Sequence, residues 1–312
     1  MLFRRRSGMF TSAREALAGL LCTPTFELIP LKDAMDHAAF LPPGARVSVT
    51  ASPVKEIEST VALAERLEAA GFRAVPHLSA RMIRDRAHLS DIVARLGEAR
   101  VTRAFVVGGD AKECGAFPDG LSLLRAIAEI DPPLPEIGIP CYPQGHPFIA
   151  DGLLLQALHE KAAYASYMTT QLCFEPGAIV SWLAARRAEG VSLPAHIGIP
   201  GATEPHRLLA LSARIGVADT HRFLTKNLRF VARLLRSGGF YRPDGLLDAL
   251  APQIADPAAG ITGLHLYTFN VVEATEAWRL RYLTAITADR PTRSGAGRLR
   301  GDEGRSPRDS RP

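Results

Sequence analysis

The stretch Arg103-Ala-Phe-Val-Val-Gly-Gly-Asp110 decides the expected fold, because it joins a buried strand to a turn and a carboxylate. Residues 105–107 show no polar alternation and include two β-branched side chains, which predicts a strand covered on both faces. Gly108 and Gly109 allow a sharp turn or the close approach of a ligand. Asp110 then stands at the carboxyl end of the strand, where α/β proteins place their chemistry, although an aspartate there can also cap the next helix.

The same pattern recurs along the chain and predicts alternating strands and helices. Strands are expected at residues 26–30, 46–52, 74–79, 103–110, 136–143, 167–174, 194–201 and 263–270. Helices are expected at residues 11–21, 54–70, 84–99, 119–129, 151–164, 176–189, 204–214, 220–237, 243–254 and 271–284. Eight such units indicate a parallel sheet closed into a (β/α)8, or TIM, barrel, which typically needs ~250 residues. The alternative is a doubly wound open sheet, but no G-x-G-x-x-G follows the first strand.

Three segments are expected along the chain of 312 residues. Residues 1–24 form an N-terminal extension with one short helix, and residues 25–285 form the TIM-barrel domain. The long interval between strands seven and eight requires extra helices, which would lie at the rim of the barrel. Residues 286–312 are rich in Arg, Gly, Ser and Pro without apolar periodicity, which predicts a disordered basic tail.

Composition and charge exclude several classes of protein. With 47% hydrophobic and 22% charged residues, the chain has an ordinary globular composition. Its net charge of +5 is concentrated at Arg4–Arg6 and in the tail, so the body is near neutral and lacks the basic face of a nucleic-acid-binding protein. No apolar run reaches the roughly 20 residues that span a bilayer, and no secretory signal is seen, so we expect a cytoplasmic protein without a membrane partner. Four scattered cysteines without CxxC spacing predict no metal site.

Polar residues at the expected strand ends form the candidate site. In chain order they are Glu27, Thr50, His77, Asp110, Tyr142 with His146 beyond it, Gln171, Tyr267 and Asn270. Glu27 is the most informative, because a carboxylate between Phe26 and Leu28 is costly to bury in its ionised form. Burial would favour the protonated form, as a general acid near neutral pH requires. The alternative is a structural glutamate that pairs with an arginine or faces solvent.

Two further residues suit recognition of a fused heterocycle. Asp110 can accept hydrogen bonds from an amino group, while Gln171 can both donate and accept. Those properties fit a pterin or a flavin, although Gln171 is equally typical of a satisfied core amide. Taken singly, His77 and His146 are more typical of packed or capping histidines. His196 and His265 are expected to be wall residues of their strands.

The strand-end residues together resemble the methylenetetrahydrofolate reductase family. The matching segments, in the family's order and spacing, are Phe26-Glu-Leu-Ile-Pro30, Val47-Ser-Val-Thr50, Gly109-Asp110, Tyr142-Pro-Gln-Gly-His-Pro147, Thr170-Gln171, Ile199-Pro-Gly201 and Tyr267-Thr-Phe-Asn270. The resemblance covers residues 25–284. It implies a TIM barrel that reduces 5,10-methylenetetrahydrofolate to 5-methyltetrahydrofolate with NADH or NADPH and bound FAD.

The resemblance also implies individual roles. Glu27 matches the acid that protonates the folate and opens its five-membered ring. Asp110 matches the aspartate that contacts the pterin and tunes the flavin, and Gln171 matches a glutamine near folate and nicotinamide. Tyr267 and Asn270 are expected to join these three in binding the substrate. The positions implied to contact the flavin are Thr50, His77, Gly109, Asp110, Tyr142, His146 and Lys161.

The chain departs from the family pattern at several of these positions. Gly108 stands where the family has an arginine that helps to hold FAD, and Val271 replaces another arginine. Leu154 and Ala157 stand where polar flavin contacts would be expected. These changes resemble the divergent bacterial branch that contains flavin-free reductases, in which hydride passes directly from NADH to folate. Flavin loss is therefore a second hypothesis beside FAD binding.

Two other functions remain open on the sequence. One is a non-catalytic folate-binding or accessory protein, and the other is a different folate-dependent one-carbon enzyme that transfers a methyl group. All three predictions make a folate the small-molecule partner. A homo-oligomer is compatible with each of them.

Overall fold

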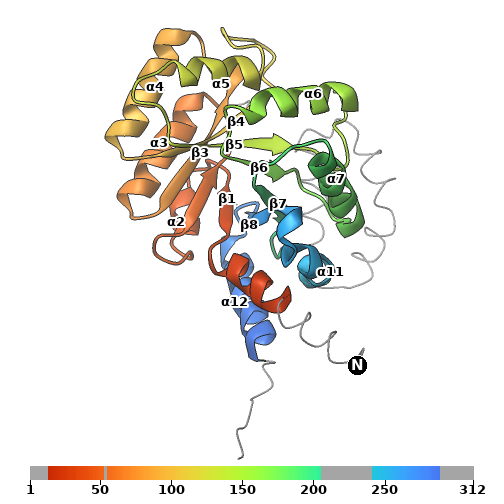
Figure 1. Cartoon of the computed structure of the whole chain (residues 1–312). Helices are drawn as coiled ribbons and strands as arrows, with labels where there is room; N and C mark the ends of the chain where they lie inside the picture. The colour runs from red at the N-terminus through yellow and green to blue at the C-terminus, as the bar shows by residue number, and fades with distance from the viewer. Residues whose placement is uncertain (1–12, 53–54, 205–240, 289–312) are drawn as a thin grey trace, which may run out of the picture.

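Eight parallel strands form a closed barrel in the computed structural model, in the order β1 to β8, with β8 paired to β1. The structure describes residues 13–52, 55–204 and 241–288. The strands are β1 Thr25–Leu28, β2 Arg46–Val49, β3 Arg73–Ser79, β4 Arg103–Val107, β5 Glu136–Cys141, β6 Tyr167–Thr170, β7 Ala195–Pro200 and β8 Ile261–Tyr267. The predicted TIM barrel is confirmed, and Figure 1 shows its helices surrounding the strands.

Helices follow the strands as the alternating pattern predicts. They are α2 Ala34–Ala38, α3 Ile57–Ala69, α4 Arg86–Glu98, α5 Gly120–Ala128, α6 Asp151–Ala162, α7 Pro176–Ala188, α11 Asp244–Ile254 and α12 Val272–Ala288, with 3-10 turns at Ala80–Met82 and Pro257–Ala259. The short α2 and the two 3-10 turns were not predicted, because they are too brief to show a helical period. The helix predicted at 220–237, and all of the helix predicted at 204–214 beyond residue 204, lie outside the described residues. Helix α12 runs to Ala288, into the first residues expected for the tail.

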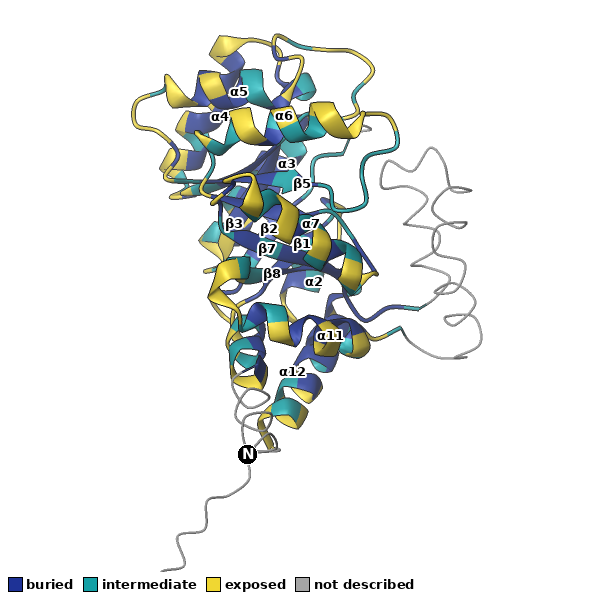
Figure 2. Ribbon diagram, turned by 45° about the vertical axis from the view of Figure 1, so that its right-hand side comes forward, coloured by how far each residue is buried: buried dark blue, intermediate teal, exposed yellow. Residues whose placement is uncertain are grey.

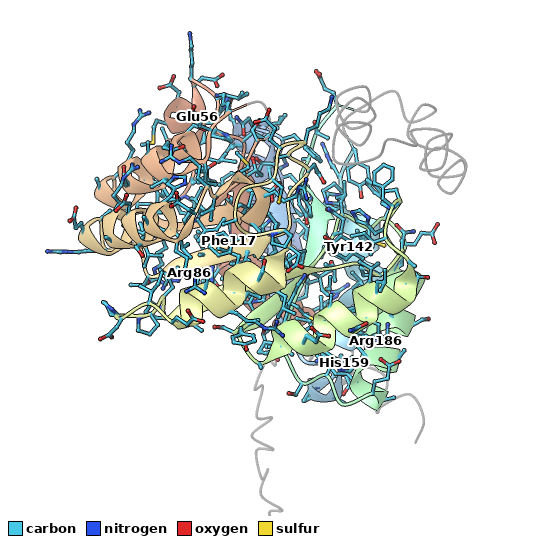
Figure 3. The ribbon with its side chains drawn as sticks, turned by 90° about the horizontal axis from the view of Figure 1, so that it is seen from above. Glu56, Arg86, Phe117, Tyr142, His159 and Arg186 are labelled. Atoms are coloured by element: carbon cyan, nitrogen blue, oxygen red, sulfur yellow. The ribbon has the colours of Figure 1, made fainter. Side chains whose placement is uncertain are left out.

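The outer core lies between the barrel and its helices. Phe26 and Leu28 of β1 and Val47 and Val49 of β2 face outward into this core, since alternate residues of a strand point to opposite faces. Figure 2 shows the strands and the inner helix faces buried, with exposed residues on the outer helix faces. Surface ion pairs join neighbouring helices. Glu189, at the end of α7, pairs with Arg186 of α7 at 2.6 Å and with His159 of α6 at 3.9 Å, and these helices lie side by side in Figure 3.

Helical residues 13–22 pack against α12 (Figure 1) and accept a hydrogen bond from a buried ion pair within α12. The Arg279 guanidinium donates to both carboxylate oxygens of Glu276 at 2.6 Å and to the Leu21 carbonyl, also at 2.6 Å. Arg279 therefore satisfies a carbonyl at the end of the first helix while neutralising Glu276. Within the described residues, no helix has both the length and the apolar composition needed to span a bilayer.

Glycines make room for rings inside the barrel. A Cβ at Gly138 would lie 2.3 Å from Tyr167 Cζ and 2.6 Å from Phe105 Cδ2. Val75, Phe105 and Tyr167 form a small apolar cluster of their own in the barrel interior, with Val107 packed against it. A side chain at 138 would displace these rings, because barrel interiors are close-packed.

Replacing Gly138 by Ala should destabilise the protein by about 1–3 kcal/mol, the usual cost of overpacking a core. The matched control is Gly97→Ala in α4, where a Cβ meets nothing within 4 Å. This control should be neutral or stabilising by up to ~1 kcal/mol, because alanine favours helix. Urea unfolding of both variants tests the packing, and equal midpoints for G138A and wild type would contradict it.

Candidate functional site

Glu27 is the centre of a polar network inside the carboxyl-terminal half of the barrel. It points inward because Phe26 and Leu28 on either side of it face the outer core. Strand pairing places Ser48 of β2 on one side of Glu27 and Tyr267 of β8 on the other. The Glu27 side chain is only 12% exposed. The structure thus places the predicted acid in a nearly closed environment.

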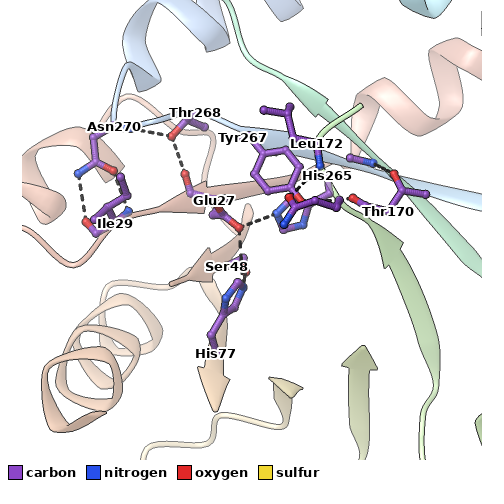
Figure 4. A network of polar contacts seen from close by, with 12 residues as sticks. Glu27, Ile29, Ser48, His77, Thr170, Leu172, His265, Tyr267, Thr268 and Asn270 are labelled. Carbon is purple, nitrogen blue, oxygen red and sulfur yellow. Dashed lines mark hydrogen bonds and ion pairs between the residues drawn. The ribbon is translucent and has the colours of Figure 1, made fainter. Parts of the chain in front are cut away.

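Two histidines face the Glu27 carboxylate (Figure 4). Nε2 of His265 lies 3.1 Å from Glu27 Oε2, and Nε2 of His77 lies 3.8 Å from the same oxygen. Ser48 Oγ lies 2.7 Å from His77 Nε2 and fixes that ring. Burial lowers the pKa of His77 to about 4, with the charge of Glu27 opposing the shift and that of His265 adding to it. His77 is therefore a neutral imidazole at physiological pH and can accept or donate a hydrogen bond beside the Glu27 carboxyl group.

The turn after β8 fastens this network to β1. Thr268 Oγ1 donates to the Glu27 carbonyl at 2.5 Å and accepts from the Asn270 amide at 3.1 Å. The Asn270 side chain accepts from the Ile29 amide at 2.8 Å and donates to the Ile29 carbonyl at 3.1 Å. Phe269 and Asn270 adopt left-handed backbone angles, with φ of 53° and 58°. The turn therefore holds the backbone at Glu27 and at Ile29, two residues beyond it.

Tyr267 closes the inner side of the network. Its hydroxyl donates to the Thr170 carbonyl at 3.1 Å, and its ring centroid lies 4.9 Å from that of His265. Gly198 makes room for this ring, since a Cβ there would lie 2.7 Å from it. Burial raises the pKa of Tyr267, and the nearby Glu27 adds to the rise. The side-chain polar atoms of Tyr267 and Asn270 form hydrogen bonds with the main chain. Substrate binding by either residue stays a prediction.

A second cluster gathers at the ends of β4 and β5. The Tyr142 and His146 rings meet edge to face at 5.2 Å. Burial raises the pKa of Tyr142 to about 12, and the charge of Asp110 adds to the rise. Partial burial lowers the pKa of His146, and Asp110 opposes that shift. Asp110 is exposed and lies within electrostatic reach of both rings, so the structure brings these three predicted residues together.

The loop between β4 and α5 requires glycine at position 109. Gly109 has a φ of +87°, and a Cβ there would lie 1.9 Å from Ser79 Oγ at the end of β3. Only glycine fits this close approach without strain. Ser79 Oγ is buried without a hydrogen-bond partner among the described residues. The turn carries Asp110 past the end of β3.

The other predicted residues lie around the same end of the barrel. Gln171 continues the β5–β6 ladder, with its amide donating to the Cys141 carbonyl at 2.7 Å, while its side-chain Oε1 accepts from the Leu172 amide at 2.8 Å. The Thr50 amide donates to the Leu28 carbonyl at 2.9 Å. Lys161 of α6 lies over the start of α5, where a Cβ at Gly120 would be 3.6 Å from its Cε. Burial lowers the pKa of Lys161, and Asp119 opposes the shift.

An exposed apolar surface borders the second cluster. The Phe148 amide donates to His146 Nδ1 at 3.3 Å, and the two rings meet edge to face at 6.0 Å. The Phe148 side chain is nevertheless 68% exposed, and Leu153 of α6 is 60% exposed. For bound FAD, the rings of Tyr142 and His146 and the Lys161 cation are suitable contacts, whereas Phe148 and Leu153 offer no polar ones. The described residues contain no group of three or more His, Cys, Asp or Glu arranged for a metal ion.

Sequence reasoning missed two members of the Glu27 network. His265 was expected to be a wall residue of its strand, and Ser48 received no role. A signal was present in the alternation of β8, since His265 and Tyr267 share the inward face. What the sequence lacked was the contact between strands one and eight, which are more than 200 residues apart along the chain.

The low pKa of His77 predicts a loss of stability in acid. The unfolded chain takes up a proton below the ordinary pKa of 6.5, whereas folded His77 does so only near 4, so stability falls as pH falls through this window. Between pH 7.5 and pH 5, His77 alone should remove about 2 kcal/mol from the free energy of unfolding. In denaturant unfolding at both pH values, H77F should lose correspondingly less stability than wild type. Identical losses would show that His77 titrates normally.

Similarity to known proteins does not assign a function to this chain. No family model matches the chain. A solved structure described as a lyase/mutase from Burkholderia cenocepacia J2315 is similar, with 14% sequence identity, a TM-score of 0.45 and 90% of each chain covered. EDTA monooxygenase from Chelativorans sp. BNC1 is similar with 10% identity and a TM-score of 0.30, over 81% of this chain and 76% of that one. At these values neither likeness carries an argument about function.

Proposed function

We propose that this protein is an oxidoreductase that reduces 5,10-methylenetetrahydrofolate to 5-methyltetrahydrofolate with NADH or NADPH. The observation that carries the proposal is the Glu27 carboxyl group, which is 12% exposed inside the barrel and faces the Nε2 atoms of His265 and His77 at 3.1 and 3.8 Å. A carboxyl group that is shielded from water and bordered by imidazoles suits a general acid. The folate substrate is inferred from the resemblance of the strand-end segments, in their order along the chain, to methylenetetrahydrofolate reductases.

In the proposed reaction, Glu27 transfers its proton to a nitrogen of the five-membered ring of the folate. The carbon–nitrogen bond to that nitrogen breaks, and the other nitrogen and its methylene carbon become an iminium. Hydride from the reduced nicotinamide then adds to the methylene carbon and gives the methyl group. Glu27 is left as a carboxylate, next to the neutral His77 ring, and must regain a proton before the next turnover.

Asp110, Tyr142 and His146 are proposed to border the same substrate. Asp110 is exposed at the end of β4, so its oxygens are free to accept hydrogen bonds from the amino group of a pterin. Its charge acts on both Tyr142 and His146, which supports a shared role for these three residues. Gln171, at the end of β6, is proposed to stand near the folate and the nicotinamide.

Glu27→Gln should lower kcat for folate-dependent NADH oxidation by about 10²–10⁴-fold, the usual contribution of a general acid. Glutamine keeps the size and the hydrogen-bonding atoms of the side chain but cannot deliver the proton. The matched control is Glu58→Gln, which alters a glutamate 2.8 Å from His88 on the outer helices, remote from the Glu27 network. Near wild-type turnover in E27Q would remove Glu27 from the mechanism.

Absorbance of the purified protein decides between FAD and direct hydride transfer. FAD bound through Tyr142, His146 and Lys161 should give a stoichiometric flavin spectrum. A colourless protein that still oxidises NADH with methylenetetrahydrofolate would instead support direct transfer. The exposed Phe148 and Leu153 and the absence of an arginine at Gly108 favour the second outcome.

The same assay separates the two other functions that the sequence left open. Tight binding of methyltetrahydrofolate without NADH oxidation would favour a folate-binding or accessory protein. Turnover of a folate that does not depend on NADH or NADPH would favour a methyl-transfer enzyme.

A further inference from the structure

The barrel interior is polar along one side from end to end. Val75, Phe105 and Tyr167 form the apolar cluster on the side of β3, β4 and β6. Apart from Gly198, Pro200 and Gly263, the inward positions of β1, β2, β7 and β8 carry hydrogen-bonding or ionisable side chains instead. These are Glu27, Arg46, Ser48, His196, His265 and Tyr267, which we call the polar column. A barrel core is normally filled by branched aliphatic residues, so this composition needs a physical reason.

The polar column reaches solvent at the amino-terminal end of the barrel. Arg46, at the start of β2, forms an ion pair with Glu136 of β5, and Arg103 Nε donates to the other oxygen of Glu136 at 2.9 Å. The Arg46 guanidinium also lies 5.2 Å from the centroid of the Tyr167 ring. The side chains of Arg46, Arg103 and Glu136 are 21%, 22% and 29% exposed, so water reaches this end.

His196 occupies the middle of the column. Its ring stacks on Tyr167 at 4.3 Å and lies over Gly263, where a Cβ would be only 2.5 Å away. Gly263 pairs with His196, and His265 stands two residues further along β8 on the same inward face. His265 is therefore the next ring above His196, and it contacts Glu27 at 3.1 Å.

Buried atoms along the column lack partners. Nε of Arg46, Nδ1 of His196 and Oγ1 of Thr169 are buried without a hydrogen-bond partner among the described residues. All three belong to inward-facing positions, and Thr169 pairs directly with His196. Buried polar atoms are nearly always satisfied, and ordered water supplies the partner where protein does not. The three atoms thus indicate water inside the barrel, between the amino-terminal end and His265.

We propose that the polar column conducts protons from the amino-terminal end of the barrel, through His196 and His265, to the Glu27 carboxylate. The proposal rests on the proposed function, in which each turnover removes one proton from Glu27. His265 gives a ring proton to Glu27 and takes another from the water on the His196 side. His196 gains a proton on one nitrogen as it releases one from the other, and solvent at the amino-terminal end supplies the replacement. One proton enters for each proton given to folate, and no electrons move.

A proton route from the amino-terminal end is needed because Glu27 is shielded from solvent at the carboxyl-terminal end. Glu27 and His265 are only 12% and 4% exposed, and a folate at the carboxyl-terminal end would cover what remains. The groups that face His196 are Arg46 from β2, Tyr167 from β6 and His265 from β8, with Glu136 of β5 bound to Arg46. Burial and the charges of Arg46 and His265 lower the pKa of His196 to about 3. His196 therefore returns to its neutral form after each transfer and does not trap a proton.

His196→Phe tests the route, because phenylalanine keeps a ring to stack on Tyr167 but removes both nitrogens. Rapid mixing of the full-length enzyme with NADH and methylenetetrahydrofolate separates the first turnover from the steady state. The proposed route replaces the proton of Glu27 only after the first turnover, so the H196F rate constant for that turnover should equal that of wild type. The steady-state rate should fall about tenfold, with an increased solvent deuterium isotope effect, since reprotonation becomes limiting. His196→Asn, which is smaller, should show the same separation if H196F folds poorly.

Val75→Ala is the control, because it alters the apolar side of the same interior. Both of its kinetic phases should match those of wild type. An unchanged steady-state rate in H196F and H196N, or an equal slowing of both phases, would overturn the proton route. Absence of turnover in the wild-type enzyme would overturn the proposed function and the route with it, whereas an active wild type with unaffected variants would overturn the route alone.

Discussion

The barrel and its candidate site both require the pairing of β8 with β1. It closes the barrel and brings His265 to within 3.1 Å of Glu27, although 238 residues separate them along the chain. The same closure places Thr268 and Asn270 on the backbone of Glu27 and Ile29. Closing a long loop costs more chain entropy than a local contact. The site therefore exists only once the whole barrel has formed, because β8 must reach β1 before His265 can contact Glu27.

Close packing and polarity coexist in the barrel because glycine and aromatic residues alternate across the strands. Gly138 makes room for Tyr167, Gly198 for Tyr267 and Gly263 for the His196 ring. A ring from a neighbouring strand fills the space that each glycine leaves. The interior therefore stays closely packed although it contains ring nitrogens and hydroxyl groups. A branched aliphatic core would be more stable on burial alone. It would leave Glu27 without the imidazoles that border its carboxyl group.

Apart from His196, the ionisable side chains of the barrel interior lie in two groups, one at each end of the barrel. Glu27 and His265 lie at the carboxyl-terminal end, whereas Arg46, Arg103 and Glu136 form their own ion pairs at the other end. His77 beside Glu27 and His196 in the middle of the barrel are kept neutral by burial, with pKa values lowered to about 4 and 3. Neutral rings avoid the cost of isolated buried charges and still donate or accept hydrogen bonds. The proposed acid chemistry and the proposed proton route both use this arrangement.

The sequence alone is enough to predict the barrel, since strand and helix periods are local properties that each segment carries. It also placed Glu27, His77, Asp110, Tyr142 and His146 at strand ends, and the structure gathers them into two neighbouring clusters. Three features emerge only in the folded barrel. His265 contacts Glu27, Asn270 holds the main chain of Ile29, and polar side chains continue through the barrel to Arg46. These relations depend on which strands become neighbours and on where a glycine admits a distant ring. Such contacts leave no periodic signal in the chain.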